Sequence, residues 1–225
     1  MWCVPKIDDE YVACMEDVLR VYARKENAAE PVVCLDEKPV QLLDSERSAL
    51  PMSPRHPKRT DYEYVRKGVA NIFCIIEPLT GRRQTHATKN RNGTSFARAL
   101  RRIARRHPHA RVIHLVVDNL STHSERCVIR AFGEIEGGAL WRRFKVHYTP
   151  KHGSWLNAAE MEASLVSREC LGSRRIADID TLKREVAVWN RGADKRRRRI
   201  KWRFRVSDAR RVFRYDGIVT ARSGH

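Results

Sequence analysis

Residues 112–123 of this 225-residue chain read VIHLVVDNLSTH. The unbroken aliphatic and β-branched run is typical of a strand buried on both faces. It ends in Asp118, followed by turn-forming residues. From Pro78 to Val117 the chain carries ten Lys and Arg but no Asp or Glu. A carboxylate therefore appears where an apolar strand should leave the core, which indicates either turn chemistry or a functional group at the edge of a sheet.

A second apolar run, VVCLDEKPVQLL at residues 32–43, predicts another central strand and places Asp36 and Glu37 within it. Neighbouring strand residues point to opposite faces, so these two carboxylates are not expected to be ligands of the same ion. Asp36 thus raises the same question as Asp118.

A third carboxylate, Glu160, lies on the helix predicted after KHGSWLN. It stands at the edge of an apolar stripe, where a carboxylate loses hydration and needs compensation. Glu162 lies roughly 200° further round the helix and is predicted to face water. The stripe is formed by Leu156, Ala159, Ala163, Val166 and Cys170.

The remaining pattern alternates strands and helices. It predicts a helix over 8–24, a Pro-rich basic loop at 51–59 and a hairpin over 68–88 that turns near 78–81. An amphipathic helix over 94–107, a short helix starting near Ser121–Thr122, a strand over 144–150 and helices over 155–170 and 179–191 complete the series. This order favours an α/β fold with a strongly basic C-terminal tail.

The charge balance restricts the partners. Against 27 acidic residues stand 45 basic ones, which gives a net charge of +18 and a pI near 10.2. Such a surplus favours nucleic acid, although a merely soluble basic protein is the alternative. The six cysteines form no CxxC pair, which suits a reducing cytosol. No signal peptide and no apolar run of membrane-spanning length is evident.

Asp36, Asp118 and Glu160 together suit a hard divalent cation such as Mg²⁺, and two such ions can support phosphodiester displacement. Each residue also has a structural alternative. Asp118 suits strand-exit turn chemistry, Asp36 an ion-pair cluster with Lys38, and Glu160 a solvated helix position. Their joint occurrence in this order favours the shared metal site.

The sequence resembles the DDE transposases of bacterial insertion sequences, in insertion-sequence family 630, which is related to the mariner superfamily. The resemblance is carried by VVCLDEKPVQLL, DYEYVRKGVANIF, VVDNLSTH, HYTPKHGSWLNAAEMEASLVSREC and IKWRF with SDAR. It extends over nearly the whole chain and implies an RNase H-like mixed sheet flanked by helices. The family's catalytic Asp, Asp and Glu fall on Asp36, Asp118 and Glu160.

The resemblance also implies a chemistry. Hydrolysis at the element's end, with Mg²⁺ or Mn²⁺ and two ions in the site, would free a 3′-hydroxyl that attacks a TA target. It implies a homodimer on double-stranded DNA, in the bacterial cytoplasm at the nucleoid. It further implies a helical lead-in at 1–30, a catalytic domain at 31–192 and a basic tail at 193–225. Full-length relatives carry a helix-turn-helix region before the equivalent of MWCVP, so the chain is expected to lack end recognition.

Supporting roles are assigned to further residues. Asn119, His123 and Asn157 are predicted to orient the carboxylates or the attacking water. A structural role is the alternative for His123, and Trp155 and His147 are interpreted as packing residues. The predicted DNA contacts, for which a solvated face is the alternative, are Lys151, His152, Arg98, Arg101, Arg102, Arg105, Arg106, Arg196, Arg197, Arg198 and Arg199, with Lys201, Arg203 and Arg205 beside them.

Two other functions remain open on sequence grounds. One is a catalytically silent DNA-binding remnant of a transposase. The other is an RNase H-like nuclease that cuts without joining strands. Cleavage that depends on the three carboxylates separates the first from an enzyme, and strand joining separates the second from a transposase.

Overall fold

A five-stranded mixed sheet forms the centre of the computed structural model, which describes residues 7–47, 52–57 and 62–215. The strand order is β3-β2-β1-β4-β5. The two parallel pairs are β1 with β4 and β4 with β5, while β1–β2 and β2–β3 are antiparallel. The strands are β1 (Val32–Ser45), β2 (Tyr64–Ile76), β3 (His86–Thr88), β4 (Ile113–Val117) and β5 (Phe144–Tyr148).

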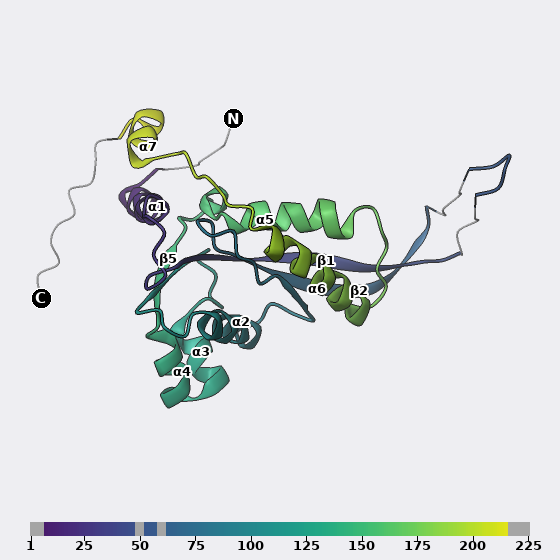
Figure 1. The fold of residues 1–225 in the computed structure, drawn as a ribbon, viewed down its shortest axis with the longest axis horizontal. Coiled ribbons are helices and arrows are strands. Elements are labelled where there is room, and N and C mark those ends of the chain that lie inside the picture. The colour runs from purple at the N-terminus through teal and green to yellow at the C-terminus, as the bar shows by residue number, and fades with distance from the viewer. Residues whose placement is uncertain (1–6, 48–51, 58–61, 216–225) are drawn as a thin grey trace, which may run out of the picture.

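Three helices cover one face of the sheet (Figure 1). They are α2 (Gly93–Arg106), α3 (Glu125–Phe132) and α4 (Glu134–Trp141). Leu35 and Phe73 from the strands pack there against Phe96 and Leu100 of α2, all almost fully buried. The apolar side of the arginine-rich helix therefore faces the core, as its sequence pattern predicts.

The other face is covered by elements from both ends of the chain (Figure 1). Near one end of the sheet, α1 packs on Val32, Cys34 and Val116 together with the start of α5. Further along, the later helices cover Ile72 and Cys74. These elements are α1 (Asp9–Tyr22), α5 (Ala159–Leu165), the π-helix η2 (Val166–Leu171), α6 (Ile179–Arg196) and α7 (Val206–Phe213).

Several element boundaries differ from the sequence prediction. The single helix expected over 155–170 is a 3-10 turn, η1 (Ser154–Leu156), followed by α5 and η2. The helix expected near Ser121–Thr122 begins only at Glu125, because Ser124 takes the N-cap position. The helix expected over 179–191 continues to Arg196. Helices α4 and α7 were not predicted.

Strands β1 and β2 continue well past the layers of helices as a long hairpin (Figure 1). The register shifts by one residue between Leu42 and Leu43, opposite Gly68, whose φ of +121° suits glycine.

Among the described residues, no helix is long and apolar enough to cross a membrane.

Candidate metal centre

Asp36 and Glu37 lie on the central strand β1 and point to opposite faces of the sheet. Cys34 packs in the cluster beneath α1, and Leu35 packs beneath α2. By strand alternation Asp36 shares the face of Cys34, and Glu37 shares that of Leu35. This arrangement agrees with the expectation that Asp36 and Glu37 are not ligands of the same ion.

Glu37 is bound on its own face by His123, whose side chain is buried. His123 Nε2 lies 2.9 Å from Glu37 Oε1, and His123 Nδ1 lies 2.7 Å from Asp118 Oδ1. Burial lowers the pKa of His123, but the hydrogen bonds and charges of the two carboxylates outweigh it and raise the pKa to about 10. His123 is therefore a cation that joins Glu37 to Asp118.

The loop that carries His123 is held on both sides. The Tyr148 hydroxyl donates to the His123 carbonyl at 2.8 Å, and the rings of Phe96 and His123 have centroids 4.5 Å apart. The sequence predicted that His123 orients Asp118, but it did not reveal that Glu37 is the second partner of His123. The available signal was strand alternation, because a buried carboxylate on the α2 face requires a cationic partner.

Glu160 is placed beside β1 by Asn157, which is 2% exposed. The Asn157 side-chain amide donates to the Leu35 carbonyl at 2.7 Å, and its oxygen accepts from the Ala159 N–H at 3.1 Å. The Glu160 N–H in turn donates to the Asn157 carbonyl at 3.0 Å. Asn157 thus ties the first turn of α5 to the residue directly before Asp36.

The three predicted carboxylates share one electrostatic environment. The pKa of Asp36 is raised to about 7, first by burial and then by the negative charges of Glu37, Asp118 and Glu160. Among the described residues, no Lys or Arg forms an ion pair with Asp36, Asp118 or Glu160. Asp118 has the His123 imidazolium beside it, whereas Asp36 and Glu160 have no cationic partner among the described residues. Carboxylates without such a partner suit a divalent cation bound through oxygen atoms.

Ligand atoms of Glu37, Asp118 and His123 also lie within 4.8 Å of one another. Both ring nitrogens of His123, however, face carboxylate oxygens. A histidine ligates a metal only as the neutral imidazole. The group that contains His123 is therefore a poor site for a hard cation. Asp36, Asp118 and Glu160 form no group this close among the described residues, and they remain the predicted donor set. Glu37 contacts Asp118 through His123.

Asp36→Asn is expected to stabilise the metal-free protein at pH 8 by roughly 1–3 kcal/mol. The native state holds a proton on Asp36 up to about pH 7, whereas an unfolded aspartate ionises near pH 4. Native stability therefore falls as the pH rises from 4 to 7, and a neutral side chain removes that loss. Urea unfolding in EDTA at pH 8 and pH 5 tests this, since the difference should shrink at pH 5. Equal stability of both proteins at pH 8 would contradict it.

Other predicted residues lie apart from the carboxylates. Asn119 is exposed, and no hydrogen bond joins it to Asp118 or His123 in the described part of the chain. It lines a hollow of about 190 Å³ beside the start of α1, together with Lys151 and His152. The three residues are thus gathered at one surface, and a contact of Asn119 with the Asp118–His123 pair is not seen.

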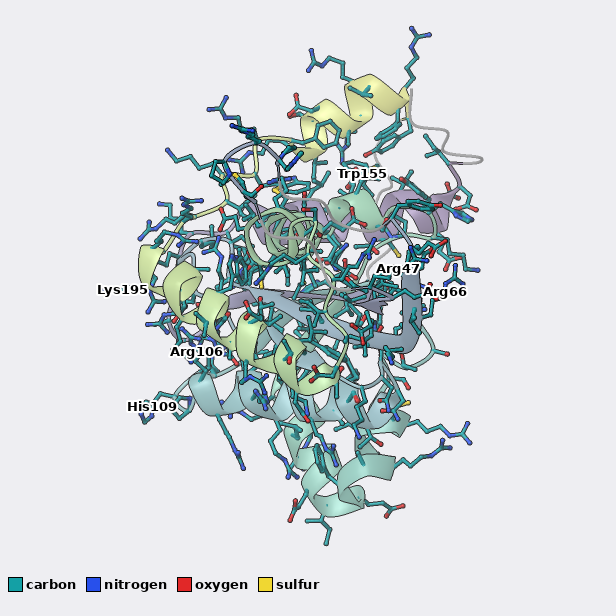
Figure 2. All side chains as sticks on the ribbon, turned by 90° about the vertical axis from the view of Figure 1, so that its right-hand side faces the viewer. Arg47, Arg66, Arg106, His109, Trp155 and Lys195 are labelled. Atoms are coloured by element: carbon teal, nitrogen blue, oxygen red, sulfur yellow. The ribbon has the colours of Figure 1, made fainter. Side chains whose placement is uncertain are left out.

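Many of the arginines predicted to bind DNA are engaged within the chain. Arg106 makes two contacts with Asp194 of α6 at 2.8 and 2.9 Å, where α2 lies beside α6 (Figure 2). Arg98, Arg102 and Arg105 on α2 are exposed and form no ion pair with a described residue. The other engaged pairs are Arg101–Glu136, Arg196–Glu169, Arg198–Glu169, Arg197–Asp194 and Arg199–Glu26.

The prediction that Glu162 faces water is wrong, because the Glu162 side chain is fully buried. Arg83 Nε donates to Glu162 Oε2 at 2.9 Å, and the Thr85 hydroxyl donates to Oε1 at 3.3 Å. Burial raises the pKa of Glu162, and the Arg83 charge opposes that rise. The apolar stripe alone did not reveal this contact, since the buried cation comes from the turn between β2 and β3.

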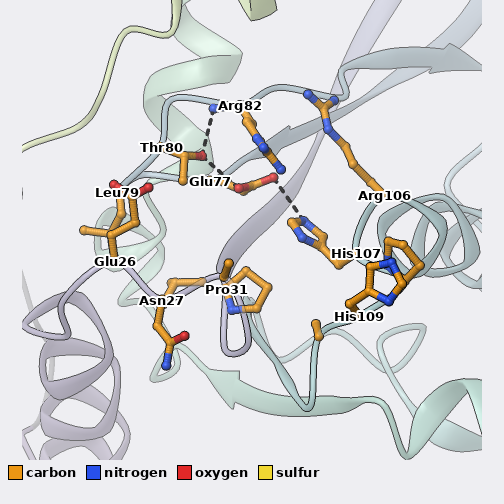
Figure 3. Close-up of a pocket in the computed structure, with 14 residues that line it drawn as sticks. Glu26, Asn27, Pro31, Glu77, Leu79, Thr80, Arg82, Arg106, His107 and His109 are labelled. Carbon is orange, nitrogen blue, oxygen red and sulfur yellow. Dashed lines mark hydrogen bonds and ion pairs between the residues drawn. The ribbon is translucent and has the colours of Figure 1, made fainter.

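A separate cavity of about 230 Å³ lies at the end of the sheet where β1 begins (Figure 3). Pro31, Leu79 and Pro108 contribute apolar walls. At its side, His107 Nε2 lies 3.0 Å from Glu77 Oε1, and the Thr80 hydroxyl also donates to Glu77. None of the three candidate metal ligands lines this cavity.

A mixed sheet with order β3-β2-β1-β4-β5, with carboxylates on β1 and directly after β4, defines an RNase H-like fold. The model of the DDE superfamily endonuclease family matches residues 31–183. The chain belongs to this family. The match includes Asp36, Asp118 and Glu160 but excludes α1 and α7.

Solved structures share the fold at low sequence identity. The Mos1 mariner paired-end complex with Mn has a TM-score of 0.56 and 16% identity, over 87% of this chain and 59% of that chain. The Mos1 strand transfer complex gives 0.55 and 15%, over 86% and 58%, and a pre-cleavage Mos1 transpososome gives 0.53 and 18%, over 85% and 61%. This chain thus spans about three-fifths of the Mos1 chains. No curated protein sequence matches it.

Proposed function

We propose that the chain is the catalytic domain of a transposase, which hydrolyses a phosphodiester at a transposon end and transfers the freed strand to target DNA. One observation carries the proposal: Asp36, Asp118 and Glu160 share one environment and have no Lys or Arg partner among the described residues. The family and the net charge of +18 support a DNA substrate. The Mos1 neighbours are complexes described as paired-end and strand transfer.

Asp36, Asp118 and Glu160 would hold Mg²⁺ or Mn²⁺, with two ions as the proposed number. Bound there, the metal would polarise the phosphodiester and lower the pKa of a bound water. The chain's own residues supply the geometry. Asn157 keeps the Glu160 helix against β1, and His123 fixes Asp118 in one orientation through its second contact with Glu37.

The same proposal extends to the wider reaction. A freed 3′-hydroxyl would attack a TA dinucleotide at the same site, and two copies of the chain would act on paired DNA ends. The family resemblance supports both steps. No covalent enzyme intermediate is needed, because the attacking groups are water and the DNA hydroxyl.

Nicking of supercoiled plasmid by the purified chain tests the proposal. We expect open circles in Mn²⁺ or Mg²⁺ and none in EDTA, because the carboxylates need the cation to engage phosphate. Adding a duplex with a free 3′-hydroxyl to the reaction tests joining to the plasmid. A chain that binds plasmid but leaves it intact in both metals would contradict the enzymatic function. Nicking without joining would reduce it to a nuclease.

A further inference from the structure

Residues 200–206, which we call the strap, cross the surface above α1 with alternating exposure. Ile200, Trp202, Phe204 and Val206 are partly buried in the cluster beneath α1, whereas Lys201, Arg203 and Arg205 are exposed. The period of two is that of an extended chain lying on an apolar surface. The sequence already predicts DNA-backbone contacts for these three cations within a basic tail. The structure adds that the strap is a docked segment with one apolar and one cationic side.

The apolar side fixes the strap to the body of the protein. The rings of Trp202 and Tyr22 have centroids 4.8 Å apart, and those of Phe204 and Trp155 are 5.7 Å apart. The Ile200 N–H donates to the Pro78 carbonyl at 2.9 Å. Trp155 lies below α7 in Figure 2. The cationic side chains are therefore presented from a packed backbone.

The cations of the strap have no ion-pair partner in the described part of the chain, in contrast to the arginines just before it. Arg196 and Arg198 both contact Glu169, and Arg197 contacts Asp194. Within the described ranges, no carboxylate forms an ion pair with Lys201, Arg203 or Arg205. Their full charge is thus available to a partner, whereas the preceding arginines would first have to break contacts within the chain.

The spacing of these cations suits a nucleic-acid backbone. Alternate residues of an extended chain are about 6.6 Å apart. Phosphates of one B-DNA strand rise about 3.4 Å each along the helix axis. A hollow of about 500 Å³ runs beside the strap and is lined by its three cations and by Arg24, Arg199 and Trp202. The hollow offers room for a backbone along a cationic wall.

The strap also lies on the same face of the sheet as the candidate metal ligands. Its apolar residues share a cluster with Cys34, which lies two residues before Asp36 on β1. Trp155, its partner beside Phe204, lies five residues before Glu160. A DNA backbone on the strap would therefore run on the face that carries the cleavage chemistry.

We propose that the strap binds the phosphate backbone of duplex DNA on the face of the sheet that carries the candidate metal ligands, without reading sequence. The inference rests on the proposed function, since DNA is the expected substrate. Contacts of this type supply affinity that falls with salt, at about 0.9 in the slope of log K against log salt for each phosphate contact.

The test is binding of a mixed-sequence duplex by the full chain in EDTA, across a KCl series. Arg203→Gln/Arg205→Gln should lower the salt slope by about 2, whereas Arg203→Lys/Arg205→Lys should keep it. The matched control is Arg126→Gln/Arg130→Gln on α3, which removes two exposed arginines from the opposite face of the sheet. Thermal unfolding of each variant verifies the fold.

An equal slope for the Gln variant and the parent, or the same loss in the α3 control, would overturn the inference. Plasmid nicking by the parent chain would leave the proposed function standing in that case. Absence of any DNA binding by the parent would instead count against the proposed function itself.

Discussion

Asp118→Asn is expected to abolish metal-dependent plasmid nicking, with a loss of more than about a hundredfold. The substitution removes the negative charge of a proposed metal ligand but keeps an oxygen that can face His123 Nδ1, which lies 2.7 Å from Asp118 Oδ1. Binding to DNA should stay the same or become slightly tighter, because one negative charge facing phosphate is lost. Nicking rates in Mn²⁺ and fluorescence anisotropy in EDTA measure the two effects separately.

The matched control for this variant is Asp9→Asn in the first turn of α1. Asp9 is exposed and forms no ion pair with a described residue. Asp9→Asn also removes one negative charge from an aspartate, but away from the candidate site, and we expect full nicking activity. Nicking by Asp118→Asn at the rate of the parent chain would refute the assignment of Asp118 as a metal ligand.

Arg83→Met is expected to destabilise the protein by roughly 3–5 kcal/mol, because it leaves Glu162 buried without its cation. The side chains of Arg83 and Glu162 are 3% and 0% exposed. Arg83 also donates to the carbonyls of Gly81 at 2.6 Å and Arg198 at 3.0 Å, so the turn and the segment after α6 lose a common anchor. The free energy of unfolding in urea measures the effect.

The double variant Arg83→Met/Glu162→Met should be more stable than Arg83→Met alone, since an apolar pair avoids the buried unpaired charge. Lys183→Met provides the control, because it breaks an exposed pair with Asp180 and should cost less than about 1 kcal/mol. If Arg83→Met behaved like this control, the buried pair would not support the fold.

The central strands could be predicted from sequence because each is a continuous apolar run, as at 112–117 and 32–35. The helix α7 could not, since Val206, Ala209 and Phe213 are separated by charged residues within a basic stretch. Its burial depends on α1, which lies far away along the chain. A local pattern does not reveal a partner of this kind.

The candidate site shows the same limit. Asp36, Asp118 and Glu160 stood out because a carboxylate at the edge of an apolar run is costly on local grounds alone. Glu37 and Glu162 did not, because each is compensated by a side chain from another element, His123 and Arg83. Their roles require the three-dimensional pairing of segments, which strand and helix periodicity do not encode.

Tyr22, at the end of α1, ties the first helix to the turn that precedes Glu160. Its hydroxyl donates to the Leu156 carbonyl at 2.8 Å and accepts from the Ala158 N–H at 3.0 Å. These contacts hold the turn that leads into Glu160, yet Tyr22 precedes the first residue that the family model matches. A chain cut at Pro31 would keep every candidate ligand and lose a clamp on one of them. The segment that the family model matches is therefore shorter than the segment needed to hold the Glu160 turn in place.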